Sequence, residues 1–590
     1  MIPLDKTLDH IVDAQLLRRS NDAEPAYVFR HTLVQEIASA SLLKQQRQEL
    51  HRRVGETLEA LYPQQRDELA PRLALHFAEA KDDAKTVEYS LAAGDAAMRV
   101  YANAEALMFY DRALAPARRV ATLEQIRHLY ARRGRALELL ARYPEAILNY
   151  NALRALAQER ALPALELAAM LPLATLFATP NPAQDLTQAA QLNTAALTLA
   201  RTLNDRAAQV QVLWNMMLEN YFRGDLQTAQ ACGEQALEIA RADNLRERLA
   251  FVLNDLSRVY FSLGPAARAL ALLEEARRLW LELDNLPMLA DNLATIGETL
   301  VTCGEYDRAL PYAQEAQRIG ERIGNYWSQT YSHFTMLPIA ADRGEISTAL
   351  ALADEMVRLS DASGFTIARG MAIGIKAQIL ARMGNFQAAR LEIQARPRFD
   401  TQTGSALETW MSALRCMIEI ARGDLEAAAA ELQQAYLTFN AKDFTSPAPI
   451  LVPLAEGQLA LAEQRAADAI AALREPIQKL GEIGVLQFLP DALLVMGRAQ
   501  LTQADRETAR ETFLQARALT QKMTLRRLEW EINAELWALE NASGNFDAAR
   551  TYRENARATI SFIAEHSTPS LRASFINLPG VRAVLDEDAA

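Results

Sequence analysis

The sequence is poor in the residues that stabilise disulfide-linked or metal-linked proteins. It has three cysteines in 590 residues, Cys232, Cys303 and Cys416, and none belongs to a Cys-x-x-Cys pair. Their odd number and wide spacing predict buried free thiols in a reducing compartment. The seven histidines are far apart and form no His-Glu-x-x-His motif, so we predict no metal site and no cofactor.

Long apolar runs are also missing. The first residues, MIPLDKTLDHIVDAQ, contain no apolar segment of the kind that a secretory signal needs. The most apolar stretch, residues 161–177, contains Pro163, Glu166 and Pro172 and falls short of a membrane span. We therefore expect a cytoplasmic protein without a membrane partner.

Positive charge is in deficit, with 62 Lys and Arg against 74 Asp and Glu and a net charge of -12. Because phosphate binding depends mainly on clustered basic residues, this deficit argues against a nucleic-acid partner. The local basic run Arg132, Arg133 and Arg135 is more typical of a solvated helix face, since Glu124 and Glu138 lie nearby.

Motifs of catalytic sites are absent as well. No Gly-x-Ser-x-Gly occurs, and the glycines of RGMAIG, residues 369–374, lack the preceding strand that a dinucleotide-binding loop requires. No Gly-rich loop ending in Gly-Lys-Ser or Gly-Lys-Thr occurs, so the chain has no nucleotide site of its own. We predict a protein that is not an enzyme and that acts by binding.

What the sequence does contain is a repeated pair of helices. Residues 293–316, LATIGETLVTCGEYDRALPYAQEA, carry one apolar stripe before Gly304 and a second stripe after it. Self-similarity at a fixed period is typical of a solenoid, in which each helix pair covers the apolar face of the next. The first alanine of each second helix, which we call the marker alanine, recurs at steps of 39 to 43 residues: Ala106, Ala146, Ala189, Ala229, Ala269, Ala309, Ala349, Ala389, Ala428, Ala469, Ala509 and Ala549.

Two further positions repeat with the marker alanines. Glycine can take the left-handed conformation that ends a helix, and it stands five residues before most markers, at Gly224, Gly264, Gly304, Gly344, Gly384, Gly423 and Gly544, with Gln464 and Ala504 in its place in two copies. A second small residue stands seven residues after many markers, at Ala113, Ala196, Ala236, Ala276, Ala316, Ala435, Ala516 and Ala556. The predicted fold class is all-α, a right-handed α/α superhelix of about twelve helical hairpins.

The pattern Ser257, Tyr260, Gly264, Ala269 and Ala276 resembles the tetratricopeptide repeat (TPR). The period of 40 is longer than the common one of about 34. In this the chain is similar to the large superhelical sensors of STAND regulators, the signal-transduction ATPases with numerous domains, that are related to the maltose-responsive activator.

The first 43 residues differ from the repeats. They predict a helix over residues 8–17, strands over 16–19 and 27–29, a turn between the strands at residues 21–25, and a helix over 31–43. This order looks like the last part of a winged helix. Residues 27–62 resemble the corresponding segment of STAND ATPases, and residues 73–107 resemble the junction where such proteins enter their repeats.

The resemblance implies a role for His31. In that family a winged-helix histidine in a His-Asp-Leu motif contacts the bound nucleotide diphosphate, and His31, Thr32 and Leu33 match the motif except for Thr32. A histidine at a helix N-terminus can donate a hydrogen bond to a phosphate oxygen. The resemblance thus implies a separate P-loop ATPase chain as partner, with His31 sensing its nucleotide in trans. The alternative is a histidine that caps its own helix.

If the first helix of each pair lines the concave surface, as in tetratricopeptide repeats, the register places aromatic and polar side chains in a groove. They are Trp214, Tyr221, Phe222, Phe251, Asn254, Arg258, Phe261, Tyr331, Phe334 and Trp410. Such a groove suits a protein or an extended peptide, because Asn pairs with backbone amides and Arg with a carboxylate. The alternative is that the rings fill the space between packed helices.

We expect four segments: a partial winged helix over residues 1–43, linker helices over 44–100, the superhelix over 101–566, and a capping segment with an acidic tail over 567–590. The predicted function is that of a non-enzymatic scaffold or sensor that recognises a protein, peptide or other ligand in a STAND-type signalling or transcription-regulatory system. A regulatory subunit that completes an NTPase in trans and a structural assembly adaptor are the alternatives.

Overall fold

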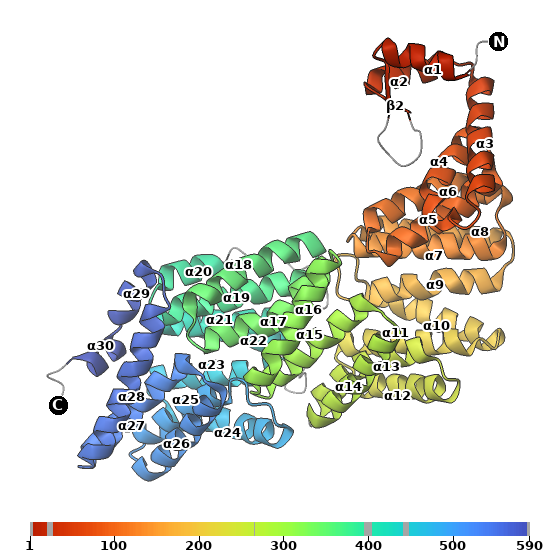
Figure 1. Cartoon of the computed structure of the whole chain (residues 1–590). Helices are drawn as coiled ribbons and strands as arrows, with labels where there is room; N and C mark the ends of the chain where they lie inside the picture. Colours follow the sequence, from red (N-terminus) through yellow and green to blue (C-terminus); the bar gives the residue numbers. More distant parts are fainter. Residues whose placement is uncertain (1–3, 20–26, 265, 395–403, 440–447, 587–590) are drawn as a thin grey trace. The chain divides into compact units, whose positions relative to one another are not determined.

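The computed structural model of the chain describes residues 4–19, 27–264, 266–394, 404–439 and 448–586. These residues form thirty helices and two short strands (Figure 1), which confirms the all-α prediction. The chain divides into two compact units, Met1–Leu140 and Ala141–Ala590. The boundaries expected after residues 43, 100 and 566 stay predictions.

The first unit starts with a helix, a two-stranded hairpin and a second helix, in the order expected from the sequence. Strands β1 and β2 pair antiparallel, with Leu17 opposite Phe29. The turn expected at residues 21–25 lies outside the described residues, and the winged helix stays a prediction. The elements are α1 (Leu4–Asp13), β1 (Leu17–Arg19), β2 (Tyr27–Phe29), α2 (Thr32–Ala40), α3 (Lys44–Leu61), α4 (Arg66–Ala80), α5 (Asp83–Arg99), α6 (Asn103–Val120) and α7 (Leu123–Leu139).

The second unit alternates first and second helices of successive hairpins. The first helices are α9 (Pro163–Ala178), α11 (Arg206–Arg223), α13 (Arg246–Leu263), α15 (Leu286–Thr302), α17 (Tyr326–Asp342), α19 (Thr366–Arg382), α21 (Gly404–Arg422), α23 (Ala448–Ala462), α25 (Leu489–Thr502) and α27 (Arg526–Ala542). The second helices are α8 (Tyr143–Glu159), α10 (Leu186–Thr202), α12 (Leu226–Ala242), α14 (Ala266–Glu282), α16 (Tyr306–Arg322), α18 (Ile346–Ser363), α20 (Phe386–Gln394), α22 (Leu425–Thr438), α24 (Ala466–Ile483), α26 (Arg506–Met523) and α28 (Phe546–Glu565). Two short helices follow, α29 (Pro569–Ile576) and α30 (Pro579–Leu585).

The marker alanines lie where the period predicts them. All twelve belong to second helices, from α6 to α28, and none is more than 3% exposed. The eight small residues that stand seven positions later are also completely buried. Small side chains one turn and two turns apart let neighbouring helices approach closely, so these positions form the contact between the two helices of a hairpin. The repeats are a TPR-like helical solenoid.

Six of the seven turn glycines adopt the predicted left-handed conformation, with φ between +72° and +83°. Gly264 is an exception, because its φ is -171°. The residue after it is Pro265, and a residue before proline is driven to extended backbone. Gln464 and Ala504 take the left-handed conformation without being glycine, with φ of 62° and 63°, so the turn persists in the two degenerate copies.

Within the second unit the later repeats lie against the central ones (Figure 1). The amide of Leu486 donates to the carbonyl of Thr302 at 2.9 Å, and the hydroxyl of Ser574 donates to the carbonyl of Met383 at 2.7 Å. Three hydrogen bonds across this contact join residues that are 183, 185 and 191 positions apart, which is between four and five repeats. We call this contact between α15–α19 and α25–α29 the seam.

A buried ionic cluster lies at the seam. The guanidinium of Arg527 in α27 donates two hydrogen bonds to Asp491 in α25, at 2.8 and 2.9 Å, and a third to Asp342 in α17. Asp491 also accepts from Arg382 in α19 at 2.9 Å, and Asp342 accepts from the hydroxyl of Tyr306. Burial by itself would raise the pKa of Asp491, but the charges of Arg527 and Arg382 lower it below the usual value. Asp491 therefore stays ionised, and the cluster joins helices that are far apart in the sequence.

Three consecutive turn glycines make room for the seam. A Cβ atom on Gly304 would lie 2.9 Å from Met523, one on Gly344 would lie 2.8 Å from Ile563, and one on Gly384 would lie 3.1 Å from Leu578. Other turn glycines, Gly224 among them, have no atom within 4 Å of that position. The same turn thus has a local role in every repeat and a packing role in the three central ones.

We expect three Gly→Ala substitutions to separate these roles. Gly264→Ala should leave stability nearly unchanged, because its backbone is extended and its Cβ position is open. Gly224→Ala should destabilise by about 1 kcal/mol through left-handed strain alone. Gly344→Ala should destabilise by about 2 to 4 kcal/mol, because it adds overlap with Ile563. Urea unfolding followed by circular dichroism measures the order; equal losses for Gly224→Ala and Gly344→Ala would contradict the seam.

Candidate functional site

The first helices form the inner layer of the second unit. Successive first helices contact each other directly at most steps, for example α15 with α17 and α21 with α23, while successive second helices of the described repeats make few such contacts. Close approach on one side and separation on the other curve the array toward its first helices. The surface of the first helices is therefore the concave one.

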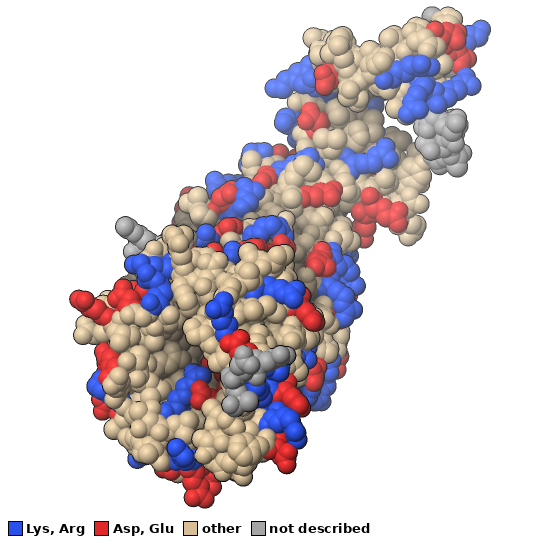
Figure 2. Space-filling model, turned by 90° about the vertical axis from the view of Figure 1, so that its left-hand side faces the viewer, with Lys and Arg blue, Asp and Glu red and all other residues tan. Residues whose placement is uncertain are grey.

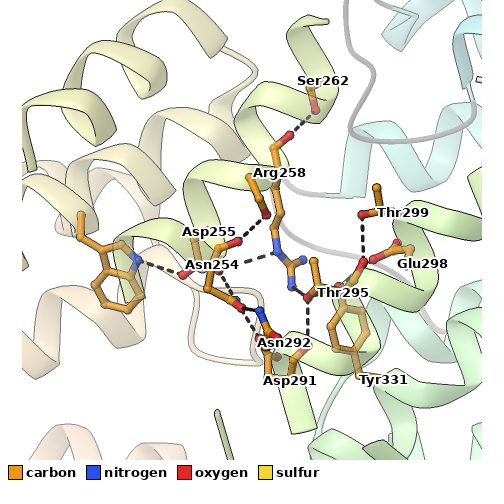
Figure 3. A network of polar contacts seen from close by, with 12 residues as sticks. Asn254, Asp255, Arg258, Ser262, Asp291, Asn292, Thr295, Glu298, Thr299 and Tyr331 are labelled. Carbon is orange, nitrogen blue, oxygen red and sulfur yellow. Dashed lines mark hydrogen bonds and ion pairs between the residues drawn. The ribbon is translucent and has the colours of Figure 1, made fainter. Parts of the chain in front are cut away.

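A polar network crosses four successive first helices, α11, α13, α15 and α17 (Figure 3). Asn254 donates from its amide nitrogen to Asp291 at 3.1 Å and to Asp255 at 3.3 Å, and its carbonyl oxygen accepts from Asn292 at 2.9 Å. Trp214 donates from Nε1 to Asp255 at 2.8 Å. Because each bond reaches the neighbouring repeat or its own helix, the network fixes the first helices side by side.

Arg258 lies at the centre of this network. It donates from Nη2 to Thr295 at 3.1 Å, lies 3.7 Å from a carboxylate oxygen of Asp255, and stands 5.1 Å from the centre of the Tyr331 ring. The Tyr331 hydroxyl donates to Glu298 at 2.6 Å. Burial would lower the pKa of Arg258, but the surrounding acidic groups raise it well above its usual value. Its guanidinium is partly exposed and stays charged.

A pocket opens on the same inner layer between α19, α21, α23, α25 and α27, with a volume of about 170 Å³. Its apolar lining includes Leu414, Ile418, Leu494, Val495 and Leu528. Its polar lining consists of Gln378, Arg382, Gln458, Asp491, Arg498 and Glu531. Arg498 bridges to the next first helix, with Glu531 at 3.0 Å and Glu535 at 2.7 Å. We call this cavity the inner pocket; two of its polar lining residues, Arg382 and Asp491, also belong to the seam.

The structure brings half of the predicted groove residues together. Trp214, Phe251, Asn254, Arg258 and Tyr331 lie in or against the network of Figure 3. Asn254 has no exposed surface, and its amide is bonded within the protein. Its observed role is to hold Asp291 and Asn292 in place, and it does not face the groove.

Four of the other predicted groove residues lie apart from this network, and Phe334 touches it edge to face through Tyr331, with ring centres 5.3 Å apart. Tyr221 and Phe222 meet edge to face near the end of α11, with ring centres 5.2 Å apart, and Phe261 is half-buried near the end of α13. Phe334 is buried and stacks on Phe365 at 5.6 Å. Trp410 is buried against α19, where a Cβ on Gly374 would lie 2.5 Å from its ring. Phe334 and Trp410 thus fill space between helices, which was the alternative interpretation.

The sequence analysis found Arg258 and missed most other polar members of the inner surface, although the register contains a signal for them. Eleven residues before a marker alanine stand Arg258, Glu298, Gln378, Gln458 and Arg498, and eighteen residues before a marker stand Asp291, Tyr331, Asp491 and Glu531. These two positions are seven residues apart, so they lie on one face of the first helix. Of the predicted rings, Phe251, Tyr331 and Trp410 stand at the second position, and the preference for aromatic residues passed over the other charged and amide side chains.

His31 stands at the N-cap of α2 with an exposed side chain and makes no capping hydrogen bond from that side chain. The three cysteines are free and buried. Burial raises the pKa of Cys303 to about 11 and that of Cys416 to about 12, which makes both thiols unreactive near neutral pH.

Three further features concern metal ligands, membrane-spanning helices and surface charge. Among the described residues, no group of three or more His, Cys, Asp or Glu side chains is placed to hold a metal ion, and no described helix is long and apolar enough to cross a membrane. On the face shown in Figure 2, Lys and Arg are interspersed with Asp and Glu. The basic run of α7 is paired with carboxylates, namely Arg132 with Asp95, Arg133 with Asp111 and Arg135 with Glu138.

We expect Asp255 to lower stability once it ionises. Burial raises its pKa to about 6, from 3.8 in an unfolded chain, while Arg258 opposes the shift. The unfolded state therefore loses the proton first, and stability falls as the pH rises from about 4 to about 6. The test compares the free energy of unfolding of Asp255→Asn with that of the parent chain. The variant should gain about 2 to 3 kcal/mol relative to the parent between pH 4 and pH 7. Urea unfolding followed by tryptophan fluorescence measures the difference; a value independent of pH would contradict the assignment.

Comparisons with known proteins give the fold alone. No family model matches the chain, and no curated protein matches its sequence. Among solved structures it is similar to the Rap protein complexed with competence and sporulation factor, at 12% identity and a TM-score of 0.39 over 72% of this chain and 99% of that one. It is similar to the Cut9–Hcn1 hetero-tetramer of APC/C, at 14% and 0.42 over 85% and 96%. It is also similar to a STAND protein with a tetratricopeptide repeat sensor from Pyrococcus horikoshii, at 15% and 0.33 over 65% and 57%. At these identities and TM-scores, the description of the inner surface depends on the chain's own geometry.

Proposed function

We propose that this chain is a non-enzymatic TPR-like scaffold or sensor whose inner surface recognises a protein or peptide partner. The observation that carries the proposal is the inner layer itself. Charged and amide side chains recur at two register positions of several first helices, among them α13, α15, α19, α23, α25 and α27, beside half-buried rings and around the inner pocket. An extended peptide presents amides, carboxylates and apolar side chains at regular spacing, and this surface offers a counterpart to each.

We assign partner contact to the inner side chains that keep exposed surface. Arg258 is 27% exposed and Arg498 is 38% exposed, and each is held by carboxylates of the inner layer. A charged group that is already oriented loses little freedom when a partner binds. Phe222, Phe251 and Phe261 are the half-buried rings that would accompany Arg258. Asn254 is buried and holds Asp291 and Asn292 in place by hydrogen bonds.

We further propose that the scaffold works in a STAND-type signalling or transcription-regulatory system. The support is the order of the elements, with a helix, a hairpin and a helix before α3 and the repeats after it. A partner bound to the inner pocket would contact Arg382 and Asp491, which also belong to the seam. Binding would thereby bias the packing of the later repeats on the central ones.

Two matched arginines test the inner surface. Arg498 in first helix α25 pairs with carboxylates of the next first helix, while Arg241 in second helix α12 pairs with Glu275 of the next second helix at 2.8 Å. Peptides selected from a random twelve-residue display library on the full chain serve as probes, and calorimetry gives their affinities. We expect Arg258→Ala or Arg498→Ala to weaken the selected peptides about tenfold or more, because a desolvated charge pair is lost.

Arg241→Ala is the control, and we expect it to change these affinities less than about twofold, as a rim or outer charge does. If Arg241→Ala weakens the peptides as much as the inner substitutions, or if neither inner substitution weakens any of them, the proposed function is wrong.

The second candidate function is a regulatory subunit that completes an NTPase in trans. It is favoured by His31, whose exposed ring makes no capping bond at the start of α2 and is therefore open to a phosphate oxygen. The test mixes the full chain with a P-loop ATPase encoded beside it and follows release of a fluorescent nucleoside diphosphate. We expect slower release with the parent chain than with His31→Ala; equal rates would remove this candidate.

A further inference from the structure

Helix α3 of the first unit, labelled in Figure 1, carries exposed apolar residues from its N-cap to its last residue. Leu43 at its N-cap and Leu50, Val54 and Leu61 within it are 70%, 47%, 40% and 65% exposed. They follow one another at seven, four and seven residues, so they lie on one line of the helix. We call these four residues the α3 stripe.

The neighbouring face of α3, about 60° to 120° round the helix from the stripe, already has a partner. Gly55 is buried, and a Cβ on it would lie 2.8 Å from the ring of Phe77 in α4. Leu58 packs against the cluster that contains Phe77 and Leu73. Because α3 is held to α4 by this face, the α3 stripe is not needed for the packing of α3 within the described part of the unit.

The spacing of the α3 stripe is that of a helix-to-helix seam. Positions 43, 47, 50, 54, 57 and 61 alternate steps of four and three residues, which is the core pattern of two helices packed side by side. Four of these six positions are apolar, and Arg47 and Thr57 occupy the other two. An amphipathic helix can contact the α3 stripe along its whole length. A flat or irregular partner would not need apolar residues at this regular spacing.

The charges beside the α3 stripe are basic. With about 100° of rotation per residue, Arg47 and Arg53 lie within about 80° of the stripe, and no carboxylate of α3 does. Glu49 lies farther round the helix and pairs with Arg53 at 3.1 Å. A second copy of this chain would bring a second set of arginines to the same seam, and like charges there are unfavourable. A partner with carboxylates beside its apolar residues is complementary.

We propose that the α3 stripe binds an amphipathic helix of a partner protein, one whose leucine-type stripe is flanked by Asp or Glu. This surface belongs to the first unit and is separate from the inner surface of the second. The chain then has two recognition surfaces, a concave one for an extended segment and a helical one at its N-terminal unit.

The probe for the test is a fluorescent 25-residue helical peptide with Leu at the core heptad positions and Glu at the flanking ones. Repulsion between the Glu side chains of two such peptides prevents the probe from forming a dimer with itself. The comparison peptide has Lys in place of Glu. We expect the full chain to bind the Glu peptide about tenfold or more tightly than the Lys peptide, measured by fluorescence anisotropy, because of the charge match.

Substitutions on the full chain complete the test. The double variant Leu50→Glu with Val54→Glu should weaken the Glu peptide about tenfold or more, and Arg47→Glu should weaken it by a smaller factor. Leu148→Glu, at an exposed leucine of α8, is the matched control and should leave binding unchanged. Leu50, Val54 and Leu148 are exposed and Arg47 is half-buried, and circular dichroism with thermal unfolding checks that each variant is folded.

Three results would overturn the proposal. The first is no binding of the Glu peptide, and the second is equal binding of the Glu and Lys peptides or equal binding by the double variant. The third is a dimer of the parent chain in analytical ultracentrifugation that the double variant converts to a monomer, since a second copy would then cover the stripe. None of these results bears on the selected peptides of the inner surface, so the two proposals fail separately.

Discussion

The ionic cluster around Arg527 is the interaction on which the form of the second unit depends. A solenoid is held together by contacts between neighbouring repeats, and such contacts by themselves leave distant repeats free of one another. Arg527, Asp342 and Asp491 add a contact across some 185 residues. Burying three charges is costly, and it is tolerated here because the guanidinium makes three hydrogen bonds to two carboxylates. Loss of Arg527 would remove the guanidinium that joins the two carboxylates.

The turn glycines make this contact possible. At Gly304, Gly344 and Gly384 the absence of a side chain lets Met523, Ile563 and Leu578 approach the turn. Backbone groups at the same turns, such as the carbonyl of Thr302, then accept hydrogen bonds from the later repeats. Apolar packing, backbone hydrogen bonds and ion pairs thus all contribute to the seam.

Part of the polar lining of the inner pocket belongs to the seam. Asp491 and Arg382 line the pocket and also belong to the cluster, while Arg498 and Glu531 extend the chain of ion pairs along α25 and α27. The shape and charge of the pocket therefore follow from how the later repeats pack on the central ones. The network around Arg258 has no such link, because its partners all belong to neighbouring repeats.

The turn glycines show that the residue that follows a turn can change the backbone conformation of its glycine. A period of 40 residues was enough to predict the hairpins, the marker alanines and the left-handed turns, because those features depend on residues within a repeat or in the next one. Gly264 departs from the rule through Pro265, a signal that the sequence also contains. The inner face was predictable as a set of register positions, which include Arg258, Phe251 and Tyr331 and would also have predicted Asp291, Glu298 and Arg498.

The sequence by itself determined the repeated helical hairpins, their register and the face that each first helix turns inward, since periodicity and small residues control contacts between adjacent elements. Only the tertiary structure decided which inward side chains stay exposed, that Asn254 is buried while Arg258 is not, and that repeats four to five steps apart meet at the seam. It also revealed that α3 is covered on one face and bare on the other. The physical reason is that curvature accumulates over many repeats, so the position of a distant partner is not encoded in any single one of them.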